Sequence, residues 1–167
     1  MRTFDAGSQV AAVELKQMLV DYWSEVDLNE GVNIADFYVE DCIAEVSAGT
    51  LKGRAAISKY YADLARNRLE KGGGRTVRHT FMSPKVEFVA KDRATISWIT
   101  VGYAGPGKPP VMDATKPVAV SDSRFECRRE NDGQWRIVGF HSKTKFIGGD
   151  SFTQTALKNV SQPGNAA

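Results

Sequence analysis

The sequence is poor in the residues and segments that would assign its 167 residues to several special classes of protein. Its two cysteines, Cys42 and Cys127, lie far apart among apolar or strand-forming residues, so we expect reduced core thiols in place of a disulfide framework. No apolar run approaches the roughly 20 residues that a membrane helix needs, and a signal peptide's basic and apolar regions are missing. We therefore expect a cytoplasmic protein with no membrane partner.

The chain also has little net charge and few histidine or cysteine residues that could bind a metal. A net charge of +2 gives no reason to expect nucleic acid as a partner, and two histidines without a cysteine pair do not favour a zinc site. The run Gly72-Gly73-Gly74 lacks the GK[ST] ending and the following helix of a phosphate loop. With 42% hydrophobic and 25% charged residues, the chain is typical of a single globular domain. We expect its core over about residues 8–147 and a C-terminal tail over 148–167, with a short helix first and a disordered polar end over Ser161–Ala167.

The hydrophobic pattern changes once along the chain, from helical to strand-like. Apolar residues recur at helical spacing up to Leu28, with Ser8 as the expected N-cap after a loose arm. The further elements that we expect are a short helix Asn33–Tyr38, a strand Asp41–Ser47, a turn Ala48–Thr50, a helix Arg54–Glu70, and strands Thr76–Met82, Lys85–Ala90, Ala94–Ala104, Val118–Arg129 and Gln134–Lys145. Helices followed by antiparallel strands predict an α+β fold, a cone-shaped barrel whose curved, mostly antiparallel sheet wraps around three N-terminal helices.

Two surfaces of these elements bear on function. The helix Arg54–Glu70 should bury Ile57, Tyr60, Tyr61 and Leu64 and expose Lys59, Arg66, Arg68 and Lys71. The strand Ala94–Ala104 is apolar on both faces, so we expect helices to cover one face and a second subunit to cover the other. A sheet curved over helices also leaves a cavity suited to a small apolar molecule.

One of the two histidines lies in the strand Thr76–Met82. Strict alternation puts Val77, His79 and Phe81 on one face, so the imidazole faces the interior. Two interpretations remain open, a buried histidine satisfied by one hydrogen bond and a general base, which needs a partner residue. Asp27 lies at the end of the first helix, where the helix dipole disfavours a carboxylate, so it should have a compensating partner or be solvated.

Four segments, taken together, resemble the SnoaL-like group of the nuclear transport factor 2-like (cystatin-like) superfamily. They are Tyr22-Trp23 with Asp27, the run Leu51–Ile57, Arg78-His79 and the run Asp132–Ile137. The resemblance extends from about Leu15 to Phe146 and is greatest to scytalone dehydratase, bile-acid 7α-dehydratase and hexachlorocyclohexane dehydrochlorinase. It implies a catalytic dyad of Asp27 and His79, with Tyr22 as a hydrogen-bond donor or acid.

The resemblance also implies a set of pocket positions. The candidate substrate-binding residues are Val46, Phe81, Trp98, Tyr103, Phe125, His141 and Phe146. For the aromatic members and His141, a place in the core or an interface stays open as the alternative. Lys143 and Lys145 lie near the position of an arginine in the bile-acid enzyme.

Some positions depart from the relatives. Val26 and Val46 stand where relatives have tyrosines, a second histidine falls near Tyr103 or Ala104, and a polar pair falls near Asp122 and Arg124. These departures argue against either exact dehydratase substrate.

The sequence thus predicts a cofactor-independent lyase or isomerase, similar to a dehydratase, that acts on a small hydrophobic molecule by general acid–base chemistry. No metal or organic cofactor is required, and we expect a homo-oligomer, either a dimer or a trimer. The alternative is a non-catalytic ligand binder, or a structural small subunit like the β subunit of ring-hydroxylating dioxygenases.

Overall fold

The computed structural model describes residues 5–46, 49–70, 74–112 and 116–148. Its elements, in chain order, are α1 (Ala6–Leu28), the 3₁₀ helix η1 (Ile34–Phe37), β1 (Tyr38–Val46), β2 (Gly49–Lys52), α2 (Arg54–Glu70), β3 (Arg75–Ala90), β4 (Arg93–Pro106), β5 (Ala119–Arg129) and β6 (Trp135–Ile147). The expected loose arm, the glycine connector and the C-terminal tail lie wholly or largely outside the described residues. The expected turn Ala48–Thr50 is described only at Gly49 and Thr50, which belong to β2.

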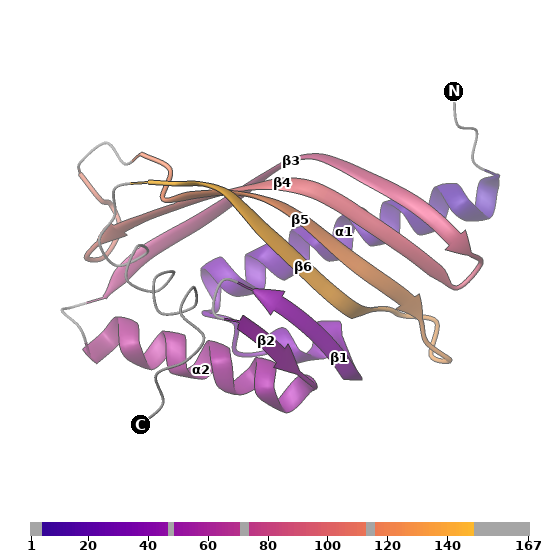
Figure 1. Ribbon diagram of the computed structural model, residues 1–167, viewed down its shortest axis with the longest axis horizontal. Helices are drawn as coiled ribbons and strands as arrows, with labels where there is room; N and C mark the ends of the chain where they lie inside the picture. The colour runs from indigo at the N-terminus through magenta and orange to yellow at the C-terminus, as the bar shows by residue number, and fades with distance from the viewer. Residues whose placement is uncertain (1–4, 47–48, 71–73, 113–115, 149–167) are drawn as a thin grey trace.

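The six strands form one sheet in the order β2-β1-β6-β5-β4-β3. β1 and β6 are parallel, and every other neighbouring pair is antiparallel. The long strands β3–β6 twist together across the molecule, α1 crosses behind them, and α2 lies beside the short β1–β2 hairpin (Figure 1). The predicted α+β architecture with a curved, mostly antiparallel sheet is confirmed.

The expected second helix, Asn33–Tyr38, is wrong, because the segment forms only a short 3₁₀ turn. Glu30 and Gly31 turn the chain with φ of 54° and 75°, and only four residues then form a 3₁₀ turn. Tyr38 and Val39 are buried and already belong to β1, because a run of aromatic and β-branched residues favours a strand. The sheet is therefore covered by two α-helices and one 3₁₀ turn instead of three full helices.

Ser83-Pro84 does not end a strand as expected. β3 continues through both residues with a shift of register between Met82 and Lys85, and Ser83 has φ of 54°. Such a bulge is tolerated because β3 is an edge strand, where a missing proline N–H breaks no ladder on the open side. The two expected strands are thus one long strand.

The core lies between α1 and the inner face of the sheet. The N-cap of α1 is Asp5, whose carboxylate accepts a hydrogen bond from Ser8 N at 2.7 Å, so the assignment of the cap to Ser8 was wrong. The apolar stripe is buried as expected, at Ala11, Leu15, Met18, Leu19, Tyr22 and Val26, and Trp23 beside it is buried as well. It packs mainly against β3 and the 3₁₀ turn, while α2 packs against β1, β2 and that turn.

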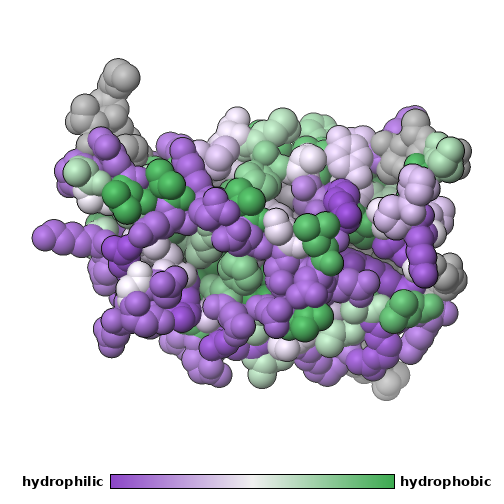
Figure 2. Space-filling view, turned by 180° about the vertical axis from the view of Figure 1, so that it is seen from behind, coloured by the Kyte–Doolittle hydropathy of each residue, from purple (hydrophilic) through white to green (hydrophobic). Residues whose placement is uncertain are grey.

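The surface seen from behind the view of Figure 1 carries both hydrophobic and hydrophilic side chains. Figure 2 shows hydrophobic side chains there in small groups that hydrophilic side chains separate. Neither α1 nor α2, the α-helices of the described ranges, is long and apolar enough to cross a membrane. Both cysteines are buried and free, as the sequence predicted.

Candidate functional site

The C-terminal end of α1 meets the edge strand β3, and the contact joins Asp27 to His79. Asp27 Oδ1 lies 2.7 Å from His79 Nδ1, and its Oδ2 accepts a hydrogen bond from the His79 backbone N–H at 2.6 Å. The side chain of Asp27 is 7% exposed and that of His79 is 21% exposed. Two residues that are 52 positions apart in the chain are thereby fixed in one geometry.

This geometry selects a tautomer of the imidazole. A carboxylate can only accept hydrogen bonds, so in the neutral ring the proton resides on Nδ1, facing Asp27. The other nitrogen, Nε2, then carries a lone pair and can accept a proton. The arrangement matches the histidine–carboxylate pairs in which the carboxylate orients a base and stabilises its protonated form.

Arg78 compensates the unfavourable position of a carboxylate at a helix C-terminus. No basic residue occupies the last turn of α1, but Arg78 Nη1 reaches from β3 to the Asp27 carbonyl oxygen at 2.8 Å. A cation at this end of a helix opposes the dipole. The expected compensation therefore comes from two neighbouring residues of β3, Arg78 and His79.

Two residues, Trp23 and Gly102, are close neighbours of the His79 imidazole. The Trp23 ring lies against it, with 4.3 Å between ring centroids and an interplanar angle of 31°. Gly102 is directly opposite His79 on β4, and a Cβ added there would lie 3.6 Å from Cδ2 and 3.8 Å from Nε2 of the imidazole. The absence of a side chain at Gly102 leaves space beside the basic nitrogen.

His79 borders a cavity of about 250 Å³ between the two helices and the sheet. Its lining comes from α1, α2 and all the strands except β2, and most of it is apolar. The described lining residues are Trp23, Val26, Val46, Tyr60, Tyr61, Leu64, Arg68, Arg75, Val77, His79, Thr100, Gly102, Ala104, Val118, Ala119, Ser121, Phe140 and Ser142. The cavity is the expected hollow, and His79 lies at its wall with Asp27 behind the imidazole.

Two hydroxyl groups of the cavity wall, those of Thr100 and Ser142, are linked through the buried hydroxyl of Ser123. Trp98 Nε1 donates to Thr100 Oγ1 at 2.7 Å, Thr100 Oγ1 lies 2.9 Å from Ser123 Oγ, and Ser123 Oγ lies 3.4 Å from Ser142 Oγ. An indole N–H can only donate, so the hydroxyl proton of Thr100 is available for Ser123 or for a ligand. Thr100 and Ser142 both line the cavity.

Tyr22 does not line this cavity, which corrects its expected place beside the dyad. It is fully buried, and its hydroxyl lies 3.0 Å from that of Tyr38 and 3.1 Å from that of Tyr61. Burial raises the pKa of all three phenols well above the usual value. Tyr61, in contrast, belongs to the cavity wall.

Of the seven expected substrate-binding residues, only Val46 lines the cavity. Phe125 and Trp98 are core residues, with ring centroids 4.5 Å apart, and Phe81 packs against the core. Phe146 is 71% exposed. Aromatic residues are equally suited to a core and to a cavity wall. In the structure, Trp98, Phe125 and Phe81 belong to the core or pack against it, and Phe146 lies at the surface.

Tyr103 and His141 lie on the outer face of the sheet. Tyr103 pairs with exposed Arg78, and His141 Nδ1 lies 2.7 Å from Glu45 Oε2 in a shallow surface groove. Lys143 lines the same groove. Asp122, Arg124 and Lys145 are exposed, and the polar residues that face inward on β5 are the serines on either side of Asp122. Tyr103 and His141 were expected to line the substrate pocket, and this expectation is corrected because neither is among the residues that line the cavity.

Sequence reasoning missed the polar part of the cavity. Arg68 was expected on the solvated face of α2, yet it is partly buried and lines the cavity. Its spacing of seven from Tyr61 and four from Leu64 puts it on the same helix face, and this pattern was available in the sequence. The inward serines of β5 alternate with Phe125, which also places them on the core face.

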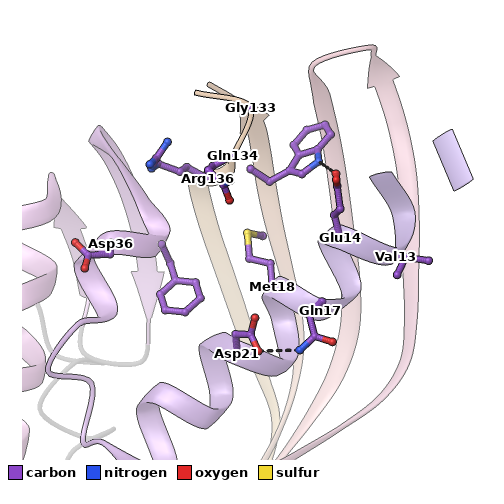
Figure 3. A pocket seen from close by; sticks show the side chains of 11 residues that line it. Val13, Glu14, Gln17, Met18, Asp21, Asp36, Gly133, Gln134 and Arg136 are labelled. Carbon is purple, nitrogen blue, oxygen red and sulfur yellow. Dashed lines mark hydrogen bonds between the residues drawn. The ribbon is translucent and has the colours of Figure 1, made fainter. Parts of the chain in front are cut away.

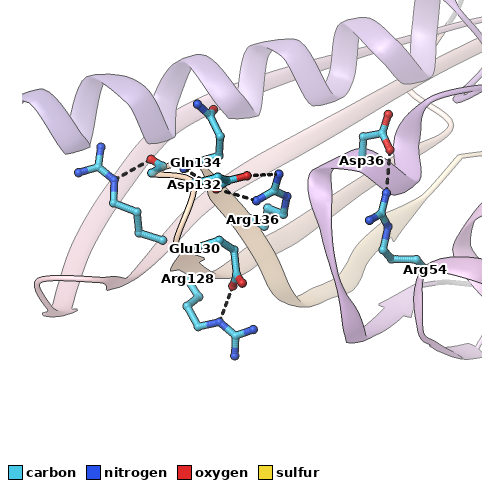
Figure 4. A network of polar contacts seen from close by, with 9 residues as sticks. Asp36, Arg54, Arg128, Glu130, Asp132, Gln134 and Arg136 are labelled. Carbon is cyan, nitrogen blue, oxygen red and sulfur yellow. Dashed lines mark hydrogen bonds and ion pairs between the residues drawn. The ribbon is translucent and has the colours of Figure 1, made fainter.

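A larger groove of about 570 Å³ lies between the first half of α1 and the β5–β6 hairpin (Figure 3). Several of its polar side chains are engaged with neighbouring residues. Glu14 accepts from Trp135 Nε1 at 3.1 Å, and Gln17 donates to Asp21 at 2.8 Å. Around the hairpin, Asp132 pairs with Arg136 (Figure 4). The groove offers structural ion pairs at the surface, whereas the smaller cavity offers a base.

Comparison with known proteins agrees with the architecture. The family profile described as a SnoaL-like domain matches residues 11–141, and no curated protein matches the chain. Similar solved structures include a protein provisionally named scytalone dehydratase from Novosphingobium aromaticivorans, with 17% identity, coverage of 85% of this chain and 89% of that one, and a TM-score of 0.66.

Two further solved structures illustrate the range of similar proteins. A hexachlorocyclohexane dehydrochlorinase is 18% identical over 87% of this chain and 92% of that one, with a TM-score of 0.64. A protein of unknown function from Mycobacterium tuberculosis is 16% identical over 92% and 88%, with a TM-score of 0.73. At these identities the likeness shows the fold alone.

Proposed function

The chain belongs to the family of SnoaL-like domains, and on that premise we propose that it is a cofactor-independent lyase or isomerase with Asp27 and His79 as its catalytic dyad. The observation that carries the proposal is the pair of contacts, 2.6 and 2.7 Å long, between Asp27 and His79 at the wall of an apolar cavity. Two of the structural neighbours are named for eliminations, of water in one case and of hydrogen chloride in the other.

In the proposed reaction, Nε2 of His79 removes a proton from a carbon of the substrate next to an activating group. In an elimination, the electron pair of that C–H bond becomes a double bond as the leaving group departs. The proton taken by His79 returns to the departing oxygen, so water leaves and the base is regenerated. In an isomerisation, the same proton returns to a different carbon.

Asp27 stabilises the imidazolium that forms during this step, and the cavity strengthens that pairing because apolar walls exclude water. The face of the Trp23 ring against the imidazole adds a cation–π contribution. Thr100 and Ser142 have hydroxyl groups at the cavity wall that can donate to a substrate oxygen as it gains charge. In this proposal they take over the donor role that the sequence had suggested for Tyr22.

The test uses cyclic β-hydroxy ketones and β-halo ketones of one or two rings, and it follows the absorbance of the new conjugated double bond. For any compound turned over, Asp27→Asn and His79→Gln should each lower kcat by about 10²–10⁴, the usual contribution of a general base. His141→Gln is the matched control, since it makes the same change in the other histidine, on the outer face. Normal turnover by folded Asp27→Asn and His79→Gln proteins would sink the proposal.

The same assay separates the enzyme from the alternative of a non-catalytic binder. A binder would hold the ketones without converting them, and its affinity would not depend on the tautomer of His79. Conversion that is lost in both dyad variants and retained in His141→Gln excludes that alternative.

A further inference from the structure

The cavity beside His79 has an uneven charge. Among the described residues that line it are two arginines, Arg68 from α2 and Arg75 from β3, and no aspartate or glutamate. Asp27 is held behind the imidazole, by the two contacts to His79. Among the described lining residues, a ligand in the cavity therefore meets the positive charge of Arg68 and no carboxylate.

Arg68 differs from the other basic residues of its helix. Lys59 and Arg66 both pair with Asp63, at 2.5 and 2.6 Å. Within residues 5–46, 49–70, 74–112 and 116–148, no carboxylate pairs with Arg68, although its side chain is partly buried. A partly buried cation without a counter-ion is costly, and an anion bound beside it would remove that cost.

The charge of Arg68 also reaches the aromatic wall of the cavity. Burial raises the pKa of the Tyr60 and Tyr61 phenols, and the positive charge of Arg68 opposes that rise in both. Since both rings line the cavity, the same positive potential acts on whatever occupies it. The cavity thus favours a ligand that places a negatively charged group near Tyr60 and Tyr61.

From this we infer that the substrate of the site is a carboxylate-bearing ring compound, with Arg68 as the residue that selects the carboxylate. The planar guanidinium forms paired hydrogen bonds with a carboxylate that a neutral amide cannot reproduce. A cavity of about 250 Å³ lies just below the range of about 300–1,000 Å³ typical of drug-sized ligands, so one or two rings fit. This inference rests on the proposed function, because the bound carboxylate is a substrate only if the chain is an enzyme.

The experiment compares two ligands of nearly equal shape, 1-naphthoate and 1-naphthamide, by isothermal titration calorimetry on the full chain. We expect wild type to bind the carboxylate at least about tenfold more tightly than the amide, which corresponds to about 1.4 kcal/mol. Arg68→Gln should abolish that preference. Arg66→Gln should keep it, because Arg66 is on the same helix but pairs with Asp63 outside the cavity.

Equal binding of the two compounds by wild type, binding of neither, or an unchanged preference in Arg68→Gln would overturn the inference. The double variant Asp27→Asn with His79→Gln separates this result from the proposed catalysis, since binding needs no proton transfer. If that variant keeps the preference for the carboxylate while no dyad-dependent turnover is found, the lyase proposal fails and the carboxylate site stands. If turnover depends on the dyad and the preference for the carboxylate is missing, the carboxylate inference fails and the lyase proposal stands.

Discussion

Gly102 lies directly opposite His79 on the neighbouring strand β4, and its missing side chain leaves the side of the imidazole open to the cavity. The Trp23 ring lies against the imidazole. A single imidazole is thereby held by a carboxylate, covered by an aromatic ring and given one free direction. At the residue scale, the proposed chemistry therefore depends on the space at Gly102 as well as on the groups around His79.

Gly102→Val should block ligand binding without unfolding the protein. A Cβ at Gly102 meets His79 and Val118 only at ordinary contact distances of 3.6–3.8 Å, and valine suits a strand, but its two methyl groups enter the cavity. We expect the affinity for 1-naphthoate to fall at least about tenfold, with little change of melting temperature. Thr80→Val, on the exposed outer face, is the control. Unchanged affinity in Gly102→Val would show that ligands do not occupy the space beside His79.

At the scale of elements, three phenols join α1, β1 and α2. The hydroxyl of Tyr22 contacts those of Tyr38 and Tyr61, and Gly31 makes room for the Tyr61 ring, which would lie 2.5 Å from an added Cβ. This junction fixes α2 against the end of α1, and so it fixes the distance across the cavity. The buried contacts of Tyr22 favour a structural role for it, and the catalytic role that the sequence suggested stays a prediction.

Tyr22→Phe should lower the free energy of unfolding by about 1–3 kcal/mol, because two buried hydroxyl groups lose their shared partner. Urea unfolding measures the change. Tyr60→Phe is the control, since its hydroxyl is not part of this chain of contacts, and it should cost less than about 1 kcal/mol. If Tyr22→Phe proved as stable as wild type while losing turnover completely, the original assignment of Tyr22 as a catalytic acid would be restored.

The β5–β6 hairpin carries a second element-scale contact, between Asp132 and Arg136 (Figure 4). Hydrogen bonds from Arg136 and from the Gln134 backbone lower the pKa of Asp132 to about 2. A carboxyl whose pKa falls on folding stabilises the fold above its unfolded pKa of about 3.9 and loses that contribution as the pH drops toward 2.

Asp132→Asn should therefore melt at a lower temperature than wild type at neutral pH, by a small amount because the pair is exposed. Between about pH 4 and pH 2 the two melting curves should converge. Thermal melts of both proteins over this range measure the difference. A gap that stays constant down to pH 2 would mean that the ionised form of Asp132 contributes nothing to stability.

At the scale of the whole molecule, the two thiols report how often the core opens. Cys42 and Cys127 are 0% and 3% exposed, and burial raises the pKa of both. Their reaction with a disulfide reagent should be slower in native protein than in urea-unfolded protein by more than about a hundredfold, because only the rare open form reacts. Immediate reaction of one thiol per native chain would contradict the closed core.

The sequence predicted the fold better than the cavity, for a physical reason. Alternation along β3 placed His79 inward, and the resemblance supplied Asp27 as its partner. Alternation alone does not say which face of a two-sided apolar strand meets the cavity, so Tyr103 was expected there although it lies outside. Arg68 was assigned to solvent because charged residues of a helix are usually solvated, and only the closeness of α2 to the sheet makes it a cavity residue.

The outer face of the sheet is where the expected homo-oligomer would form. Ile99 and Met82 are 38% and 50% exposed on that face, beside buried Val101. A dimer or trimer covering them stays a prediction, and light scattering on the purified chain measures it.

The most direct test of the account is the position of the proton on His79. Nitrogen-15 NMR of the two histidines, with His141→Gln for assignment, reports which ring nitrogen is protonated at alkaline pH, where the imidazole is neutral. The account predicts a proton on Nδ1, facing Asp27, and a bare Nε2 toward the cavity, with this preference reduced in Asp27→Asn. A neutral His79 with its proton on Nε2 would contradict it.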